Sequence, residues 1–267
     1  MRKHLNSGVS ILRACGALTL AAVVCAGPAQ ANVQVGAVTF SGENRLSAYS
    51  NEVSGPGAAS SFLTRHSNFD DQLSLNSDWK SGKDVRWSSQ LGARFTGDPR
   101  VDLTRASLQK LSLDRFSPDR HISLGDFFGS FTQYTLNQNL KGFKWYEENA
   151  GGFQTGILAG IAKNRWDDLW TRNVSETVDR YVLGAQVRRS LPLGSAVGIQ
   201  LVGSRDDRTA GSTADWFAQN LLGVNWSLPS NADMSISGES AWGDATITHP
   251  ATGREFKRGG AHKVSVR

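Results

Sequence analysis

The stretch that most constrains the fold is 216–242, which reads WFAQNLLGVNWSLPSNADMSISGESAW. Every second residue from Trp216 to Trp226 is apolar except Asn220. Successive side chains of a strand point to opposite faces, so this alternation predicts a strand with one apolar and one polar face. Residues 228–233 are rich in turn formers, and the alternation resumes from Met234. The stretch therefore predicts an antiparallel hairpin, either in a membrane-spanning sheet or in a soluble β-sandwich with tryptophan in its core.

The spacing of the aromatic residues favours the membrane alternative. Trp216 and Trp226 lie ten residues apart on the apolar face. At a rise of about 3.3 Å per residue and a tilt of roughly 45°, they are separated by about 23 Å along a membrane normal. Transmembrane β-barrels carry an apolar band about 25 Å tall that is edged by aromatic residues. Asn220 is the exception, because it falls within this band.

The first 31 residues have the features of a signal peptide. Arg2 and Lys3 precede a short apolar run at 14–26, and Ala29-Gln30-Ala31 forms an A-x-A cleavage site before Asn32. Both cysteines of the chain lie within this segment, so the predicted mature chain has no thiol chemistry. The segment holds three of the 29 basic residues and no acidic ones, which leaves 26 against 24, and no nucleic-acid-binding pattern is present.

The rest of the 267-residue chain is too polar for membrane helices. Only 39% of the residues are hydrophobic, and no later run approaches the roughly 18 apolar residues that a spanning helix needs. A chain of this kind spans a membrane only as a closed barrel, because every backbone group must be paired. We expect residues 32–68 to form a leader or first strands, and residues 69–267 to form about ten barrel strands.

The connections between the predicted strands alternate in length. Short periplasmic turns and longer external loops are typical of outer-membrane barrels. Short turns are expected at 80–84, 117–120, 147–152, 192–195 and 228–233, and longer loops at 97–104, 127–139, 164–177, 205–214 and 243–260.

In these features the chain resembles Gram-negative outer-membrane β-barrel proteins of the porin-like kind. The resemblance covers the signal peptide and roughly residues 69–267, and one local phrase combines Gly125-Asp126, Tyr134-Thr135-Leu136 and Lys141-Gly142. It implies an all-β, antiparallel barrel of about ten or more strands in the cell outer membrane. The implied partners are outer-membrane lipid and the barrel-assembly machinery. Such barrels usually end in Phe or Trp, whereas this sequence ends in Arg267. Either the sequence is a fragment or the family's ending does not apply, and we expect an open or imperfectly closed sheet.

The alternation assigns candidate residues to each face of the barrel. Polar residues that alternate with the apolar ones are predicted to face the lumen, or, in a sandwich, the solvent: Arg86, Gln90, Arg94, Lys144, Gln186, Arg188, Gln200 and Glu239. Aromatic residues of the apolar face are predicted to lie at the membrane interfaces: Trp79, Trp87, Trp145, Tyr181, Trp216, Trp226 and Trp242.

No motif predicts an enzyme, a metal site or a cofactor. The triplet His66-Ser67-Asn68 is expected in a loop and lacks a second histidine, and the acidic residues at 167, 168, 176 and 179 match no calcium loop. The favoured function is a porin-like channel or transport barrel for small solutes. The alternatives are a non-conducting structural or surface-interaction barrel of the outer membrane, and a secreted carbohydrate-binding β-sandwich.

Overall fold

The computed structural model describes residues 29–52, 66–163, 165–170, 179–207, 215–231 and 234–266. Most of the predicted signal peptide lies outside these residues, and β1 begins at Ala29 within the predicted cleavage site. The strands are β1 (Ala29–Val35), β2 (Val38–Asn51), β3 (His66–Ser81), β4 (Val85–Thr96), β5 (Ala106–Phe116), β6 (Arg120–Ser130), β7 (Asn137–Glu148), β8 (Phe153–Ala162), β9 (Asp179–Ser190), β10 (Ala196–Asp207), β11 (Trp216–Asn231), β12 (Met234–His249) and β13 (Gly253–Val266), with short helices α2 (Asp167–Trp170) and η2 (Pro192–Gly194).

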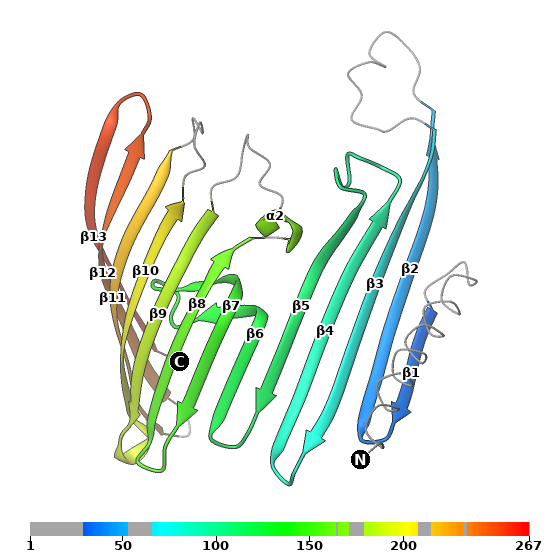
Figure 1. The fold of residues 1–267 in the computed structure, drawn as a ribbon. Helices are drawn as coiled ribbons and strands as arrows, with labels where there is room; N and C mark the ends of the chain where they lie inside the picture. Colours follow the sequence, from blue (N-terminus) through cyan, green and yellow to red (C-terminus); the bar gives the residue numbers. More distant parts are fainter. Residues whose placement is uncertain are drawn as a thin grey trace, which may run out of the picture. The chain divides into compact units, whose positions relative to one another are not determined.

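The 13 strands of the described residues form one antiparallel sheet in which spatial order follows sequence order (Figure 1). This confirms the predicted all-β, antiparallel fold, and a single sheet rules out the sandwich alternative. Within the described part of the chain, β1 pairs only with β2 and β13 pairs only with β12, so the sheet is not closed. None of the described helices is long and apolar enough to cross a membrane.

The chain divides into two compact units, and the division passes through strands β3 to β5. The first unit comprises residues 1–78 and 90–109, and the second comprises 79–89 and 110–267. Each unit is described by itself below. The first unit contains β1, β2 and an ordered loop at 97–105, whereas the second unit contains the complete strands β6 to β13.

The structure corrects several of the predicted connections. The long loop expected at 243–260 is wrong, because β12 continues to His249 and β13 begins at Gly253. The loop expected at 127–139 is shorter and covers only 131–136. The triplet that begins at His66 opens strand β3 and is not a loop. In each case residues without a clear apolar period nevertheless pair along their backbones with the neighbouring strand.

The register of the second unit aligns apolar residues of eight strands in one row. Residues directly opposite each other in paired strands point to the same face. The side chains of this row define what we call the apolar face, and several of them are exposed, with Leu201 at 57%. The row runs from β6 to β13 through Ile122, Trp145, Ile157, Ala185, Leu201, Leu222, Trp242 and Gly260.

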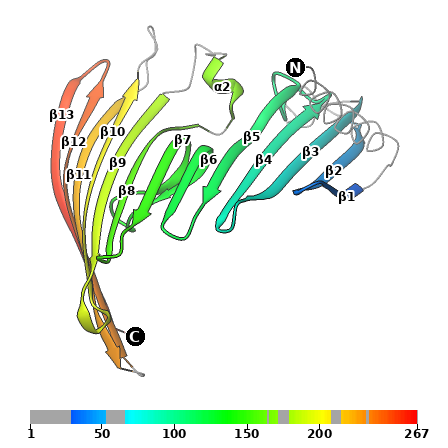
Figure 2. The same cartoon turned by 60° about the horizontal axis from the view of Figure 1, so that its bottom comes forward.

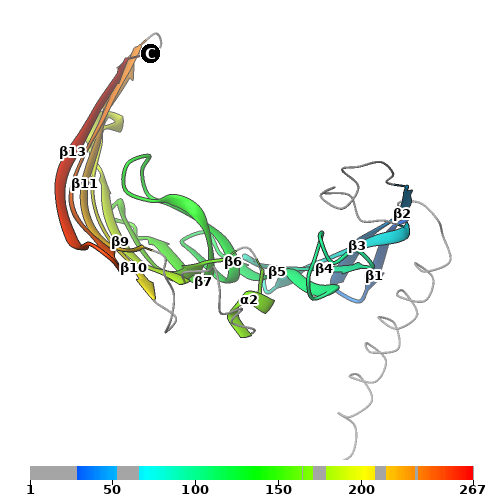
Figure 3. The same cartoon turned by 90° about the horizontal axis from the view of Figure 1, so that it is seen from above.

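The β6–β7 connection and the segment that follows β8 leave the same end of the strands but lie on different faces of the second unit. Seen from above, the β6–β7 connection and α2 lie on opposite sides of the strands (Figure 3). The segment before α2 covers the apolar face near Lys141, where the Trp166 indole N–H donates a 2.6 Å hydrogen bond to Asp126. Lys141 forms an ion pair with Asp126 and lies 5.1 Å from the centre of the Trp166 ring. The face that carries the β6–β7 connection is called the loop face below.

Candidate functional site

The loop face of the second unit gathers five of the polar residues singled out in the sequence. Gln186 and Gln200 are directly opposite each other on β9 and β10. Arg188 follows Gln186 on the same face of β9, towards the β9–β10 turn. Glu239 of β12 is opposite Asn225 of β11. Lys144 of β7 faces the same side, with its ammonium group 5.6 Å from the centre of the Phe127 ring. The predicted sharing of one face is therefore present among these five residues.

The β6–β7 connection is a compact loop formed by Phe131–Leu136. The backbone N–H of Phe131 donates to the carbonyl of Leu136 at 3.1 Å, and the hydroxyl groups of Thr132 and Thr135 are 2.6 Å apart. These internal hydrogen bonds give the loop a defined shape. The loop includes Tyr134-Thr135-Leu136, one of the local segments that support the resemblance to outer-membrane barrels. The sequence alone suggested no chemistry for this segment.

Two distant strands bind this loop through polar contacts. The backbone N–H of Tyr134 donates a 2.8 Å hydrogen bond to the Glu239 carboxylate of β12. The Lys263 ammonium of β13 donates a 3.0 Å hydrogen bond to the side-chain carbonyl of Gln133. The loop therefore reaches across the loop face from β6 and β7 to the last two strands.

The loop rests on positions where the sheet has no side chain. A Cβ atom added to Gly184 would lie 2.6 Å from the Phe131 ring, and one added to Gly223 would lie 2.4 Å from the Thr135 methyl group. Such distances are too short for real side chains, so these glycines provide space for the loop. An apolar cluster supports it from below and contains Phe127, Leu136, Leu140, Leu158, Val182 and Val202.

Two glycines of the local segments that support the resemblance, Gly125 and Gly142, lie on the two strands that the loop connects. Gly125 of β6 is opposite Gly142 of β7. A Cβ atom on Gly142 would lie 2.1 Å from the carbonyl oxygen of Ala159, and Gly125 has a φ of +92°. Both positions require glycine, Gly142 because of close backbone approach and Gly125 because of its backbone conformation as well.

A polar groove of about 330 Å³ lies beside the loop. Its charged side chains are Arg188, Glu239 and Lys263, so it carries two cationic groups and one carboxylate. The side-chain oxygen of Asn225, which lines the groove, is buried and accepts no hydrogen bond among the described residues. The groove can accommodate a small polar solute, with hydrogen-bond donors and acceptors on its walls. Its lining also includes Thr132, Ser227, Ser237 and Ser265.

A Ser–His–Asp cluster on β5 and β6 lacks the geometry of a nucleophile relay. Nε2 of His121 lies 3.1 Å from both the Ser123 hydroxyl oxygen and Asp114 Oδ1. A relay needs the carboxylate at one ring nitrogen and the hydroxyl at the other. Here both groups meet the same nitrogen, and Ser123 donates directly to Asp114 at 2.5 Å. Ser123 is 0% exposed, so the cluster is a structural contact.

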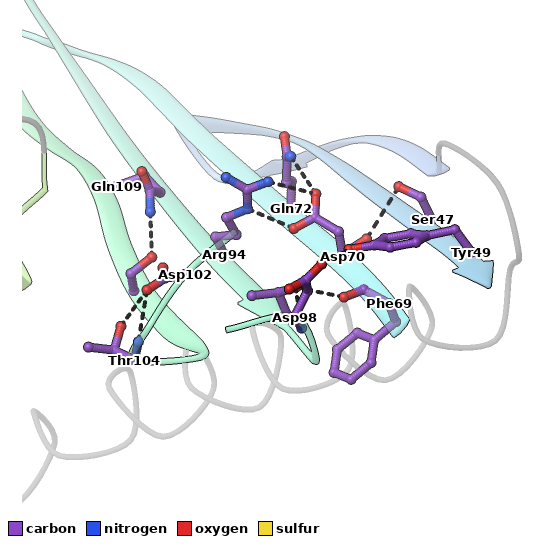
Figure 4. A network of polar contacts seen from close by, with 12 residues as sticks. Ser47, Tyr49, Phe69, Asp70, Gln72, Arg94, Asp98, Asp102, Thr104 and Gln109 are labelled. Carbon is purple, nitrogen blue, oxygen red and sulfur yellow. Dashed lines mark hydrogen bonds and ion pairs between the residues drawn. The ribbon is translucent and has the colours of Figure 1, made fainter. Parts of the chain in front are cut away.

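In the first unit, Arg94 belongs to a polar network at the base of loop 97–105 (Figure 4). Its guanidinium donates to the two Asp70 carboxylate oxygens at 2.7 and 3.1 Å. The Tyr49 hydroxyl donates to Asp98 at 2.8 Å, and the same carboxylate accepts the Arg100 backbone N–H at 2.9 Å. Arg94 is thus held by an ion pair. The other two polar candidates of β4 are Arg86 and Gln90.

Five aromatic candidates of the second unit lie on the apolar face. Trp145 and Trp242 belong to the apolar row, and Trp226 is opposite Val197. Tyr181 is opposite Arg205, and Trp216 is opposite Thr248. Trp79 and Trp87 stack on each other with ring centres 5.9 Å apart. Their placement at membrane interfaces remains a prediction.

The sequence did not reveal the residues that bind the loop. Lys263 is expected from the sequence only as part of the final strand. Its role depends on a contact with Gln133, 130 positions away, which alternation does not encode. Among the described residues, no group of three or more His, Cys, Asp or Glu side chains is arranged to hold a metal ion.

Comparisons with known proteins give matches only to solved structures, at low similarity. No family model and no curated protein matches the chain. A solved structure of a triple mutant of the Rh. blastica porin is 10% identical, with a TM-score of 0.28, and the match covers 85% of this chain and 100% of that one. A structure described as "Asymmetric conductivity of engineered proteins" is 10% identical, with a TM-score of 0.27 and the same coverage. The function is therefore argued from the geometry of this chain.

Proposed function

We propose that the chain is part of a porin-like barrel of the outer membrane whose loop face lines a passage for small polar solutes. The observation that carries the proposal is the inverted arrangement of its faces. Large apolar side chains such as Leu183, at 63% exposed, and Ile199, at 53%, are on the open face, while Gln200 is buried on the other. A water-soluble sheet would cover its apolar face, whereas lipid solvates such a face directly.

The positions of the acidic residues that flank the apolar row on β7 and β12 fit strands that are tilted in a membrane. Trp145 is followed by Glu147 towards the short β7–β8 turn, whereas Trp242 is followed by Asp244 towards the opposite end of the strands. Five strand spacings of about 4.8 Å, at a tilt of about 40°, change depth by about 15 Å. The row would thus cross more than half of the roughly 25 Å apolar band, with Trp145 and Trp242 displaced from the midplane towards opposite interfaces. The β11–β12 strands also extend beyond the β9–β10 turn (Figure 2).

This tilt accounts for the polar residue within the apolar alternation of β11. Asn220 is opposite Asp244, and its amide donates a 3.3 Å hydrogen bond to the Asp244 carboxylate. Both residues lie on the interface side of Trp242 in the tilted arrangement. The proposal therefore assigns Asn220 a position towards a membrane interface, beside the polar partner Asp244.

The loop and its groove supply the selective part of the proposed passage. The loop narrows the space over the loop face, and the groove beside it presents Arg188, Lys263 and Glu239. Side-chain charges that line a pore select the ions that enter it. The two cationic groups favour solutes that carry a negative charge. The non-conducting barrel remains the second candidate, because loop 131–136 packs firmly against the sheet.

The test combines membrane fractionation with solute permeability. We expect the expressed full chain to fractionate with the outer membrane, and vesicles that contain it to release small anionic sugars faster than cationic analogues of equal size. Arg188→Glu should reverse that preference. Membrane insertion without permeability would favour the structural barrel, and a soluble periplasmic chain would exclude both.

A further inference from the structure

A second groove, of about 1140 Å³, lies at the end of β7 to β13 that is opposite the β9–β10 turn. Most of its side chains belong to outward rows of the apolar face. One row of paired residues consists of Tyr181, Arg205, Ala218 and Thr246. The next row consists of Trp216, Thr248 and Arg254. The groove therefore opens on the side that the proposed function assigns to lipid, and the inference below rests on that function.

Among the described residues, two guanidinium groups of the groove have no partner. Neither Arg205 nor Arg254 forms a hydrogen bond or ion pair with any part of the chain that the structure describes, and both side chains are exposed. Acidic residues that line the same groove are already engaged. Asp206 accepts two hydrogen bonds from Arg180, and Asp207 has a partner of its own. The groove thus has an uncompensated positive charge.

An arginine on a lipid-facing surface is tolerated only near a membrane interface. At the bilayer midplane it costs roughly 2–4 kcal/mol, and the cost falls to about 0–1 kcal/mol near an interface. Arg205 lies near the end of β10, and Arg254 is the second residue of β13. Both lie beyond Leu201 and Trp242 of the apolar row, towards one edge of the band. This position corresponds to the depth of lipid headgroups.

The remaining walls of the groove are suited to an amphiphile. Tyr181 and Leu183 are exposed and apolar or aromatic, at 41% and 63%. Ala218 and Thr246 between the arginines are small, which leaves room for a headgroup. A guanidinium can donate two parallel hydrogen bonds to phosphate oxygens, and it is more weakly hydrated than an ammonium group. The volume also exceeds the 300–1000 Å³ of common small-molecule pockets.

We propose that this groove binds the phosphate headgroup of an anionic lipid between Arg205 and Arg254, with the acyl chains along Leu183 and the apolar row. Charge complementarity selects the headgroup, and the exposed apolar side chains select a lipid over free phosphate. The bound lipid would compensate the two guanidinium groups. It would also fix the depth of β10 to β13 in the bilayer.

The test measures lipid binding to the refolded full chain in uncharged detergent micelles that contain phosphatidylglycerol or phosphatidylcholine with the same acyl chains. Native mass spectrometry gives the affinity for each lipid. We expect clear preference for phosphatidylglycerol. Each of Arg205→Gln and Arg254→Gln should weaken it by about fivefold, from the roughly 1 kcal/mol that a cationic side chain contributes near a membrane surface. Arg188→Gln removes the same charge from the loop face and should leave the preference unchanged.

Three outcomes would overturn the inference. Equal affinity for the two lipids shows that headgroup charge is not recognised. Displacement of phosphatidylglycerol by inorganic phosphate shows a simple anion site. An equal effect of Arg188→Gln shows that only the overall charge matters. Protease protection in phosphatidylcholine vesicles separates this result from the proposed function: insertion without lipid preference rejects the lipid site alone, whereas failure to insert rejects both.

Discussion

The backbone N–H of Tyr134 donates a 2.8 Å hydrogen bond to the carboxylate of Glu239, a residue 105 positions further along the chain. Glu239 therefore contributes to two parts of the structure, the loop and the groove. It holds the Phe131–Leu136 loop, and it lines the polar groove beside the loop together with Arg188 and Lys263. Loop position and groove charge depend on the same side chain in this arrangement.

Replacement of Glu239 by alanine should loosen the loop. A hydrogen bond to a charged group contributes about 1.5–3 kcal/mol, so hydrogen exchange at the Tyr134 amide should accelerate by roughly tenfold to a hundredfold. Glu255→Ala is the matched control, because Glu255 lies near His249 and Lys257 at the β12–β13 end and has no contact with the loop. Unchanged exchange at Tyr134 in Glu239→Ala would contradict the loop contact.

Replacement of Gly223 by valine should displace the loop by steric overlap. The added Cβ would lie 2.4 Å from the Thr135 methyl group and 2.7 Å from Gln200 Oε1. Overpacking of this kind costs roughly 1–3 kcal/mol, and we expect new protease cleavage within 131–136. Gly259→Val is the control, since nothing lies within 4 Å of its added Cβ. Equal protease resistance of the two variants would show that the loop does not rest on Gly223.

An arginine at position 222 should impair membrane folding much more than one at position 186. Leu222 lies in the apolar row, whereas Gln186 lies on the loop face. Leu222→Arg should lower the free energy of unfolding in vesicles by roughly 2–4 kcal/mol, measured by urea titration, whereas Gln186→Arg should cost less. Equal losses would reverse the assignment of the faces.

Replacement of Asp98 by alanine should loosen loop 97–105 of the first unit. The Asp98 carboxylate accepts hydrogen bonds from the Tyr49 hydroxyl and the Arg100 backbone N–H. Loss of these contacts should cost roughly 2–3 kcal/mol and accelerate proteolysis within the loop. Asp84→Ala in the β3–β4 turn removes an equal charge from an exposed position. Similar proteolysis in both variants would mean that Asp98 does not organise the loop.

Alternation in the sequence was sufficient to predict most of the strands and the direction of their side chains. The period-two pattern of residues such as Leu183, Ile199 and Leu222 depends only on the local direction of side chains along a strand. The antiparallel all-β fold was therefore predictable, and neighbouring strands joined by short connections are also adjacent in the sheet. The closed barrel implied by the resemblance was not found among the described strands.

The loop and its contacts were not predictable by the same reasoning. Residues 127–139 showed no clear period because Phe127 and Leu136 pack into the apolar cluster beneath the loop. Polar residues of β12 such as Asp244 suggested a loop, although their backbone groups pair with β13. The partners of Gln133 and Tyr134 come from strands that are distant in sequence. Local patterns cannot identify contacts that depend on the completed sheet.

The order of the strands has a consequence for how the molecule folds. Every strand pairs with its neighbour in sequence, so the sheet can be assembled one hairpin at a time with small loop-closure entropy at each step. The contacts of the 131–136 loop join residues 105 and 130 positions apart and require β12 and β13 to be in place. The loop would therefore dock late, and protection of the Tyr134 amide would be a kinetic marker that the last strands have been added.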